Sequence, residues 1–383
     1  MLPLSNRVPV SVKASPTLPS TSQRQGWRWE THDVMLNALP ALLPHPNLAR
    51  FTSGHLETLK IGTRVADGRG SIAKHKDLFE RSELKNGNHY VNLEAILPDY
   101  IENNPTLPAF FQFKDGHKGS EYKDWKHFWE IERDPCIHKG LSPASLEFAL
   151  NYFDKQPLTP ERLEADPNHN IFKSVFHFQQ RIIEQMQGIK TQEEQKGHAS
   201  QKKLVELALL LGVGSHFDQD WRNPMHTSIF HKWALGFNIK TDSHVFFENA
   251  QSLKQEQEWL EGIKANATAL RAKILPRSQE WLKVAMAKRL QDSFLNLFHL
   301  AYADRCLREE HSEKDAYKDA LKAAWTSENF MPEWMKKVTM FTATMFESAH
   351  KEAGRPHLLG KDLLNRTSLQ KLTTKHPNLE TPF

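Results

Sequence analysis

Apolar residues follow a helical spacing along most of the chain from Trp27 onward. The spacing of Val34, Leu36, Leu39, Leu42 and Leu43 is helical, whereas the β-branched alternation typical of strands is rare. The same spacing, with its start and stop signals, predicts further helices over residues 171–186, 200–220, 243–261, 278–308 and 333–353. The pattern therefore predicts an all-α fold.

Two parts of the chain lack this periodicity. Residues 1–26 are rich in Pro, Ser and Thr and carry few apolar residues in register, which predicts a disordered leader or arm. Gly- and Asn-rich stretches make residues 52–130 the least regular part of the remainder, where we expect inserted loops. No internal repeat or linker divides residues 27–383, so we expect a single helical domain there.

Composition narrows the class of protein only a little. A chain of 383 residues can bury a substantial core. The 50 Lys and Arg exceed the 46 Asp and Glu by four, without the basic stripe of a nucleic-acid-binding surface. Cys136 and Cys306 are too few for a disulfide framework and are interpreted as thiols.

Hydropathy argues against an integral membrane protein. No apolar run reaches the roughly 20 residues that a membrane helix needs, and the first 26 residues lack the apolar centre of a secretory signal. We therefore expect no transmembrane segment. We expect a protein that is secreted or delivered outside the cell, although the sequence does not reveal the export route. A cytoplasmic location is the alternative.

Candidate metal ligands gather in the stretch LGVGSHFDQDWRNPMHTS, which begins at Leu211. His216 and Asp220 are four residues apart, so on a helix both side chains leave the same face and can bind one ion. Pro224 then interrupts the helix and allows His226 to turn back toward the same pocket. A second pair at the same spacing, His244 and Glu248, follows. One such pair alone is more often surface or core, but the combination predicts a polynuclear site.

These residues resemble the bacterial zinc-dependent phospholipases C, whose helical fold is shared with the S1 and P1 nucleases. The family motif is His-x-x-x-Asp-x-x-x-x-x-His with Pro two places before the last His, and this chain fills it without a gap. The next His-x-x-x-Glu of the phospholipases is matched as well. The matching residues are His216, Asp220, Pro224, His226, His244 and Glu248.

Upstream segments extend the resemblance from Trp27 to about Glu248. The family places Asp-Tyr ahead of a His embedded in aromatics, and here LPDY and KHFWE are similar. The family also has a Trp followed by a His that opens the first helix, as in GWRWETHDVM. The residues concerned are Trp27, Trp29, His32, Asp99, Tyr100, His127, Phe128 and Trp129.

The resemblance implies three zinc ions, and two at the minimum. The first ion would be held by Asp99, His127, His216 and Asp220, and the second by His226, His244 and Glu248. Asp220 would bridge to a third ion, which would also take His32 and the free amine of an N-terminal Trp27.

The chain departs from the family at each of these sites. The segment between Asp99 and His127 is longer than in the family. Trp27 lies inside the chain, so its amine exists only if the arm is removed, and Glu30 or Asp33 is the alternative oxygen ligand. The spacing from His226 to His244 is longer than in the family and contains His231 as a rival ligand.

The implied chemistry is hydrolysis of a phosphodiester by water that the zinc ions activate. The family gives Asp99 the further role of orienting or deprotonating this water, and purely structural coordination is the alternative.

The expected substrate is a phosphatidylcholine-type phospholipid at a membrane surface, cleaved to diacylglycerol and the phosphorylated head group. Glu248 favours the phospholipase branch, and Tyr100 and Phe128 are candidates to enclose a choline head group. A stable nucleic-acid partner is not expected. Two alternatives remain open: a single-strand nuclease of the P1 and S1 kind, and a non-catalytic helical interaction protein with a vestigial metal site.

Overall fold

The computed structural model describes residues 30–66, 78–100 (with gaps at 81, 85, 92 and 98), 103, 143–227 (with gaps at 168 and 222), 253–310 and 331–360. Every regular element in these ranges is a helix, which confirms the prediction of an all-α fold. The pairing outside the helices is an isolated bridge between Ala199 and Gly360. The predicted arm, residues 1–26, lies outside the described residues.

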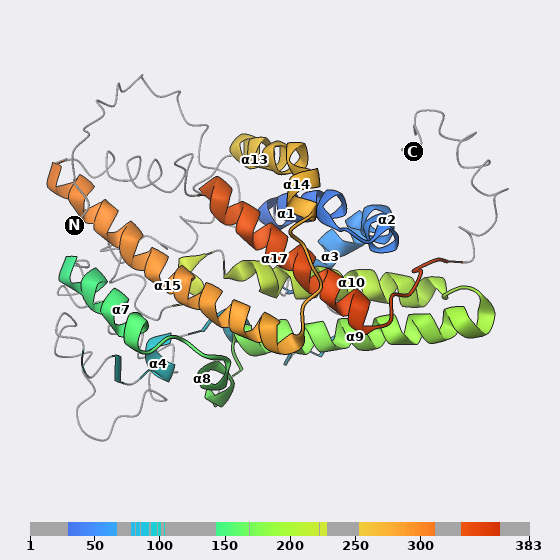
Figure 1. Ribbon diagram of the computed structural model, residues 1–383, viewed down its shortest axis with the longest axis horizontal. Helices are drawn as coiled ribbons and strands as arrows, with labels where there is room; N and C mark the ends of the chain where they lie inside the picture. The colour runs from blue at the N-terminus through green and yellow to red at the C-terminus, as the bar shows by residue number, and fades with distance from the viewer. Residues whose placement is uncertain are drawn as a thin grey trace, which may run out of the picture.

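The helices are short near the start of the chain and long in its second half (Figure 1). The first part contains α1 (Glu30–Leu42), α2 (Pro46–Gly54), α3 (Leu56–Ala66), the 3-10 helix η2 (Asn86–His89) and α4 (Leu93–Ile96). The middle part contains α7 (Pro143–Lys155), α8 (Pro160–Ala165), α9 (Ile171–Lys196), α10 (Gln201–Asp220) and the 3-10 helix η5 (Pro224–His226). The last part contains α13 (Leu253–Ala265), α14 (Ala267–Arg271), α15 (Gln279–Glu310) and α17 (Met331–Glu352).

Local capping explains where α9 and α10 begin and end. The Asn170 side chain accepts a hydrogen bond from the Lys173 amide at 3.0 Å, which satisfies a donor at the start of α9. The helix continues past its predicted end at residue 186 and stops at Gly197, whose φ of 74° suits glycine. Ser200 caps α10, so the predicted helix over residues 200–220 is confirmed.

The other long helices also agree with the sequence pattern. Helix α15 corresponds to the prediction for residues 278–308, and α17 to that for residues 333–353. Of the prediction for residues 243–261, only the part from Leu253 onward is described, as the start of α13.

Helix α10 runs through the centre of the bundle. Its neighbours are α3, α9 and α17, and Figure 1 shows α17 crossing the α9–α10 pair. Every residue of α10 from Leu207 to Asp220 is buried, so this part of the helix has no solvent-facing stripe. The polar residues in its last two turns therefore lie inside the protein.

Two glycines allow α3 and α10 to cross closely. A Cβ added at Gly212 would lie 2.1 Å from the Leu59 carbonyl oxygen, and one added at Gly62 would lie 2.5 Å from the Leu209 carbonyl oxygen. Only the missing side chains permit this approach. The crossing fixes α3 one helical turn before His216, and thereby sets the geometry of the site described below.

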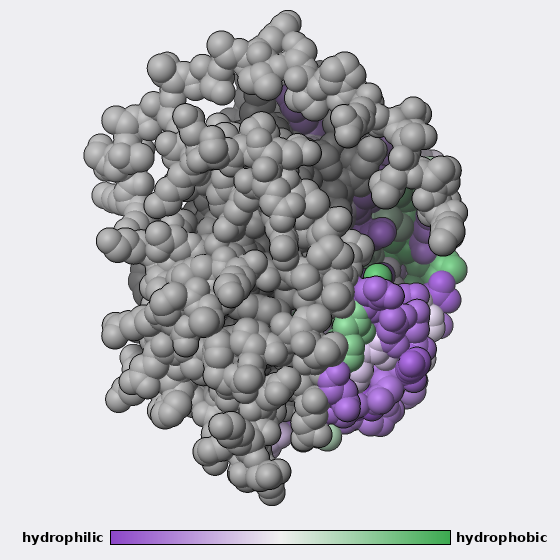
Figure 2. Space-filling view, turned by 90° about the vertical axis from the view of Figure 1, so that its left-hand side faces the viewer, coloured by the Kyte–Doolittle hydropathy of each residue, from purple (hydrophilic) through white to green (hydrophobic). Residues whose placement is uncertain are grey.

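The buried apolar residues form one core cluster that extends from α1 to α17 and the segment after it. None of the described helices has a stretch that is long and apolar enough to cross a bilayer. On the face seen in Figure 2, the described residues that reach the surface are mostly hydrophilic, with a few apolar ones between them.

Candidate metal centre

The end of α10 and the turn after it bring three of the predicted ligands together. Asn223 N donates to Asp220 O at 3.0 Å, and His226 N donates to Asn223 O at 3.0 Å. The Thr227 hydroxyl closes the turn by donating to Pro224 O at 2.6 Å. As a result, His226 Nδ1 lies 3.8 Å from Asp220 Oδ2, and His216 Nε2 lies 3.3 Å from the same oxygen.

His32 reaches this point from the first turn of α1. Its ring stacks on that of His216, with centroids 4.2 Å apart, and its Nε2 lies 3.5 Å from Asp220 Oδ1. One ligand atom from each of His32, His216 and Asp220 lies within 4.8 Å of the other two, and all three residues are buried. This group can hold a metal ion.

The structure adds a histidine that the sequence pattern does not single out. His89 Nδ1 lies 2.7 Å from Asp220 Oδ2 and 3.2 Å from His216 Nε2. His89 is the last residue of η2, and its Nε2 donates to Ala66 O, the carbonyl that ends α3, at 3.2 Å. The segment is tied to the site by Val91 N, which donates to His226 O at 2.7 Å. Because His89 has no ligand-type residue at helical spacing, its only sequence signal is a lone histidine in an irregular region.

Asp220 is the charged centre of the cluster. Burial alone raises the pKa of Asp220, but the neighbouring His216 and His226, with hydrogen bonds from His216 and His89, outweigh burial and hold the pKa well below its usual range. Asp220 is therefore a carboxylate at neutral pH.

The proton positions around Asp220 fit a cation. A carbonyl oxygen only accepts, so His89 Nε2 carries a proton, and its other nitrogen, Nδ1, faces a carboxylate oxygen of Asp220. A contact of 2.7 Å between these two atoms contains either a proton, as in the hydrogen bond that lowers the pKa of Asp220, or a metal ion in its place. Imidazole nitrogens and carboxylate oxygens are ligands that zinc accepts, so these residues fit that ion.

Asp99 and Tyr100 make contacts with α7, and Asp99 is not a member of the group formed by His32, His216 and Asp220. Asp99 Oδ1 accepts a hydrogen bond from the Tyr152 hydroxyl at 2.9 Å, because the residues after α4 lie against α7. Burial, and then this bond, raise the pKa of Tyr152 to about 12. Tyr100 is 2% exposed, which leaves little ring surface for a head group. Its ring packs in an aromatic cluster with Phe148, Tyr152, Phe153 and Phe294.

Five other predicted site residues lie outside the described residues, and their roles stay predictions. They are Trp27, His127, Phe128, His244 and Glu248. Of the two alternative oxygen ligands beside His32, Glu30 begins α1, and Asp33 Oδ2 accepts from Arg64 at 2.8 Å. The Asp33 carboxylate is therefore engaged in an ion pair with α3.

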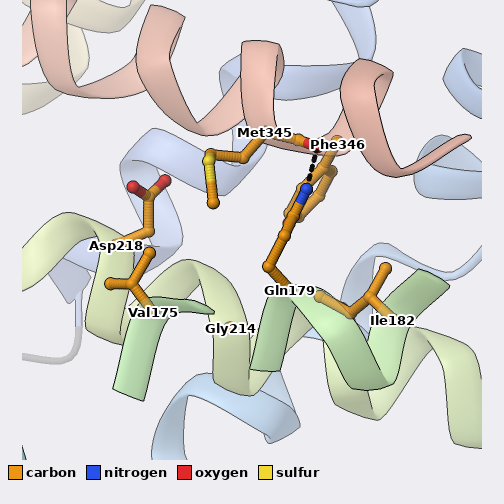
Figure 3. A pocket seen from close by; sticks show the side chains of 7 residues that line it. All are labelled: Val175, Gln179, Ile182, Gly214, Asp218, Met345 and Phe346. Carbon is orange, nitrogen blue, oxygen red and sulfur yellow. Dashed lines mark hydrogen bonds between the residues drawn. The ribbon is translucent and has the colours of Figure 1, made fainter. Parts of the chain in front are cut away.

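A second buried carboxyl, Asp218, lies in α10 two residues before Asp220 and faces α9 and α17. It borders a cavity of about 10 Å³ between α9, α10 and α17, which is large enough for one water (Figure 3). Neither carboxyl oxygen has a hydrogen-bond partner of good geometry, and burial raises the pKa of Asp218 to about 7. In Figure 3 its side chain points toward α17, so Asp218 belongs to the helix packing around Gln179 and Met345.

Comparison with known proteins adds no family to this description. No family model, no curated protein and no solved structure matches the chain. The function is therefore inferred from the residues of the site and from their geometry.

Proposed function

We propose that this chain is a zinc-dependent phosphodiester hydrolase, and specifically a phospholipase C. The observation that supports the proposal best is the convergence of four buried histidines on one ionised carboxylate. These residues are His32, His89, His216, His226 and Asp220. A cluster of this kind costs folding free energy because it buries a charge and several polar rings. Binding of a cation would offset this cost.

The two oxygens of Asp220 face different histidines. Oδ1 is directed toward His32, whereas Oδ2 is near His89, His216 and His226. This division suits a carboxylate shared between two ions, one on the His32 side and one on the other side. At least two zinc ions are therefore proposed, and a third if His244 and Glu248 join.

The charge of the centre favours an anionic substrate. Asp220 is the one carboxylate in the described cluster, and neutral histidines add no charge, so divalent ions leave the site positive. When bound, zinc polarises phosphoryl oxygens and lowers the pKa of water from about 15.7 toward about 7. The burial of all five side chains excludes bulk water and strengthens the attraction for a phosphate anion.

The proposed reaction is cleavage of phosphatidylcholine on the glycerol side of its phosphate. This choice rests on the resemblance of the ligand motif to the phospholipases and on Glu248. Tyr100 does not support it, because its ring packs in the aromatic core. A preference for single-stranded DNA over phospholipid vesicles would assign the same centre to a nuclease.

The test combines metal analysis with an assay on both substrates. We expect purified protein to contain two or three zinc ions per chain and to release phosphocholine from phosphatidylcholine vesicles. His216→Ala should remove both properties because it deletes a ligand near Asp220. His350→Ala is the matched control, since His350 is also buried but donates to Pro356 O away from the centre. Active protein without metal, or a fully active His216→Ala variant, would refute the proposal.

A further inference from the structure

A glutamine amide is buried beside the proposed metal centre. Gln219 precedes Asp220 in α10 and is 0% exposed. Its Oε1 lies 2.9 Å from His32 Nδ1, and this contact joins the end of α10 to the start of α1, 187 residues apart in sequence.

The hydrogen bond determines which nitrogen of His32 carries the proton. An amide oxygen only accepts, so the proton of a neutral His32 resides on Nδ1. The lone pair then resides on Nε2, the nitrogen that lies 3.5 Å from Asp220 Oδ1. A flipped amide would present its NH₂ group to Nδ1, move the proton to Nε2 and prevent coordination there.

Folding stability alone does not account for a glutamine at this position. Gln219 Nε2 is buried and has no hydrogen-bond partner among the described residues. Such an unsatisfied donor destabilises the folded state and offsets what the hydrogen bond to His32 contributes to stability, so a leucine of similar size would serve the fold about as well. We therefore attribute the presence of a glutamine at this position to the hydrogen bond that its oxygen accepts from His32.

We propose that Gln219 is a positioning residue that holds His32 in the tautomer and orientation required for metal binding through Nε2. This inference rests on the proposed metal centre and explains how His32, its ligand from α1, is held ready to bind the ion. Hydrogen-bond partners behind a ligating histidine fix its ring in this way, and their loss weakens metal affinity. An uncharged amide performs this task without adding a second negative charge next to Asp220, which keeps the centre attractive to a phosphate anion.

The experiment measures zinc binding by metal-stripped protein in competition with a chelator. Gln219→Leu should weaken the affinity for the ion bound by His32 by about tenfold to 100-fold. The stability of the metal-free protein should change little, because the variant removes the unsatisfied Nε2 donor together with the hydrogen bond to His32. Gln219→Glu retains an acceptor oxygen and should keep most of this affinity. Gln179→Leu is the matched control: it removes another buried amide, whose Nε2 donates to Met345 O at 2.9 Å, and should reduce stability but not zinc affinity.

A double variant and a spectrum separate positioning from a general structural effect. Gln219→Leu should weaken zinc binding no further in a His32→Ala background, because the residue acts through His32. The ¹⁵N chemical shifts of His32 in metal-free wild type should show the proton on Nδ1. Wild-type zinc affinity in Gln219→Leu, an additive double variant, or a proton on Nε2 would overturn the inference. Absence of zinc binding by the wild type would instead refute the metal centre itself, and the inference with it.

Discussion

Gly212→Ala tests whether the close crossing of α3 and α10 positions the proposed centre. The added methyl group would lie 2.1 Å from Leu59 O, whereas ordinary contacts begin at 3.4 Å, so the two backbones must separate by about 1.3 Å. Overpacking of this kind costs typically about 1–3 kcal/mol, and the better helix propensity of alanine returns at most about 1 kcal/mol. We expect a net loss of about 1–2 kcal/mol in the free energy of unfolding.

The same displacement should weaken metal binding. Helix α3 ends in Ala66, whose carbonyl accepts from His89 Nε2, so moving α3 relative to α10 moves His89 relative to Asp220. Because this carbonyl is the partner behind His89, we expect zinc affinity to fall about tenfold or more. Urea unfolding followed by circular dichroism measures the first effect, and competition with a chelator measures the second.

Gly262→Ala provides the control for helix propensity. Gly262 lies inside α13, and a Cβ there would meet nothing within 4 Å. This variant should be as stable as the wild type or more stable by up to about 1 kcal/mol, with unchanged zinc affinity. If Gly212→Ala behaved like Gly262→Ala in both measurements, the argument from the helix crossing would be refuted.

Three further predictions use other parts of the structure. Asp220→Asn should abolish zinc binding and turnover together, because the shared carboxylate is lost; bound zinc at the wild-type stoichiometry would contradict this. Burial lowers the pKa of His350 to about 4 from 6.5, so between about pH 6.5 and pH 4 this residue binds more protons in the unfolded state, and its contribution to the stability of metal-free protein should fall by up to about 3 kcal/mol as the pH decreases. Asp218, whose pKa is raised to about 7, contributes in the opposite direction, so the test is the difference between the wild type and a His350 variant. His350→Phe removes the His350 contribution alone, so the stability difference between wild type and variant in urea unfolding should change by about 2–3 kcal/mol between about pH 7 and about pH 4.5, and an unchanged difference would contradict the prediction. A form that begins at Trp27 should bind one more zinc ion than the full chain if the free amine is a ligand, and equal zinc content would exclude that role.

The local part of the site was readable from the sequence because it depends on short-range geometry. His216 and Asp220 share a helix face at a spacing of four residues, and Pro224 ends that helix before His226. The positions of the long helices followed from apolar periodicity and caps such as Ser200, which are also local signals.

The contacts between distant segments were decided only by tertiary structure. His89 is 131 residues from Asp220, and its place depends on the end of α3 and on hydrogen bonds to the turn around His226. Asp99 follows an irregular stretch, so the sequence does not indicate how far it lies from α10. In the structure it accepts a hydrogen bond from Tyr152. Sequence spacing specifies which side chains share one helix, whereas the approach of α3 to α10 at Gly62 and Gly212 determines which helices place their side chains around Asp220.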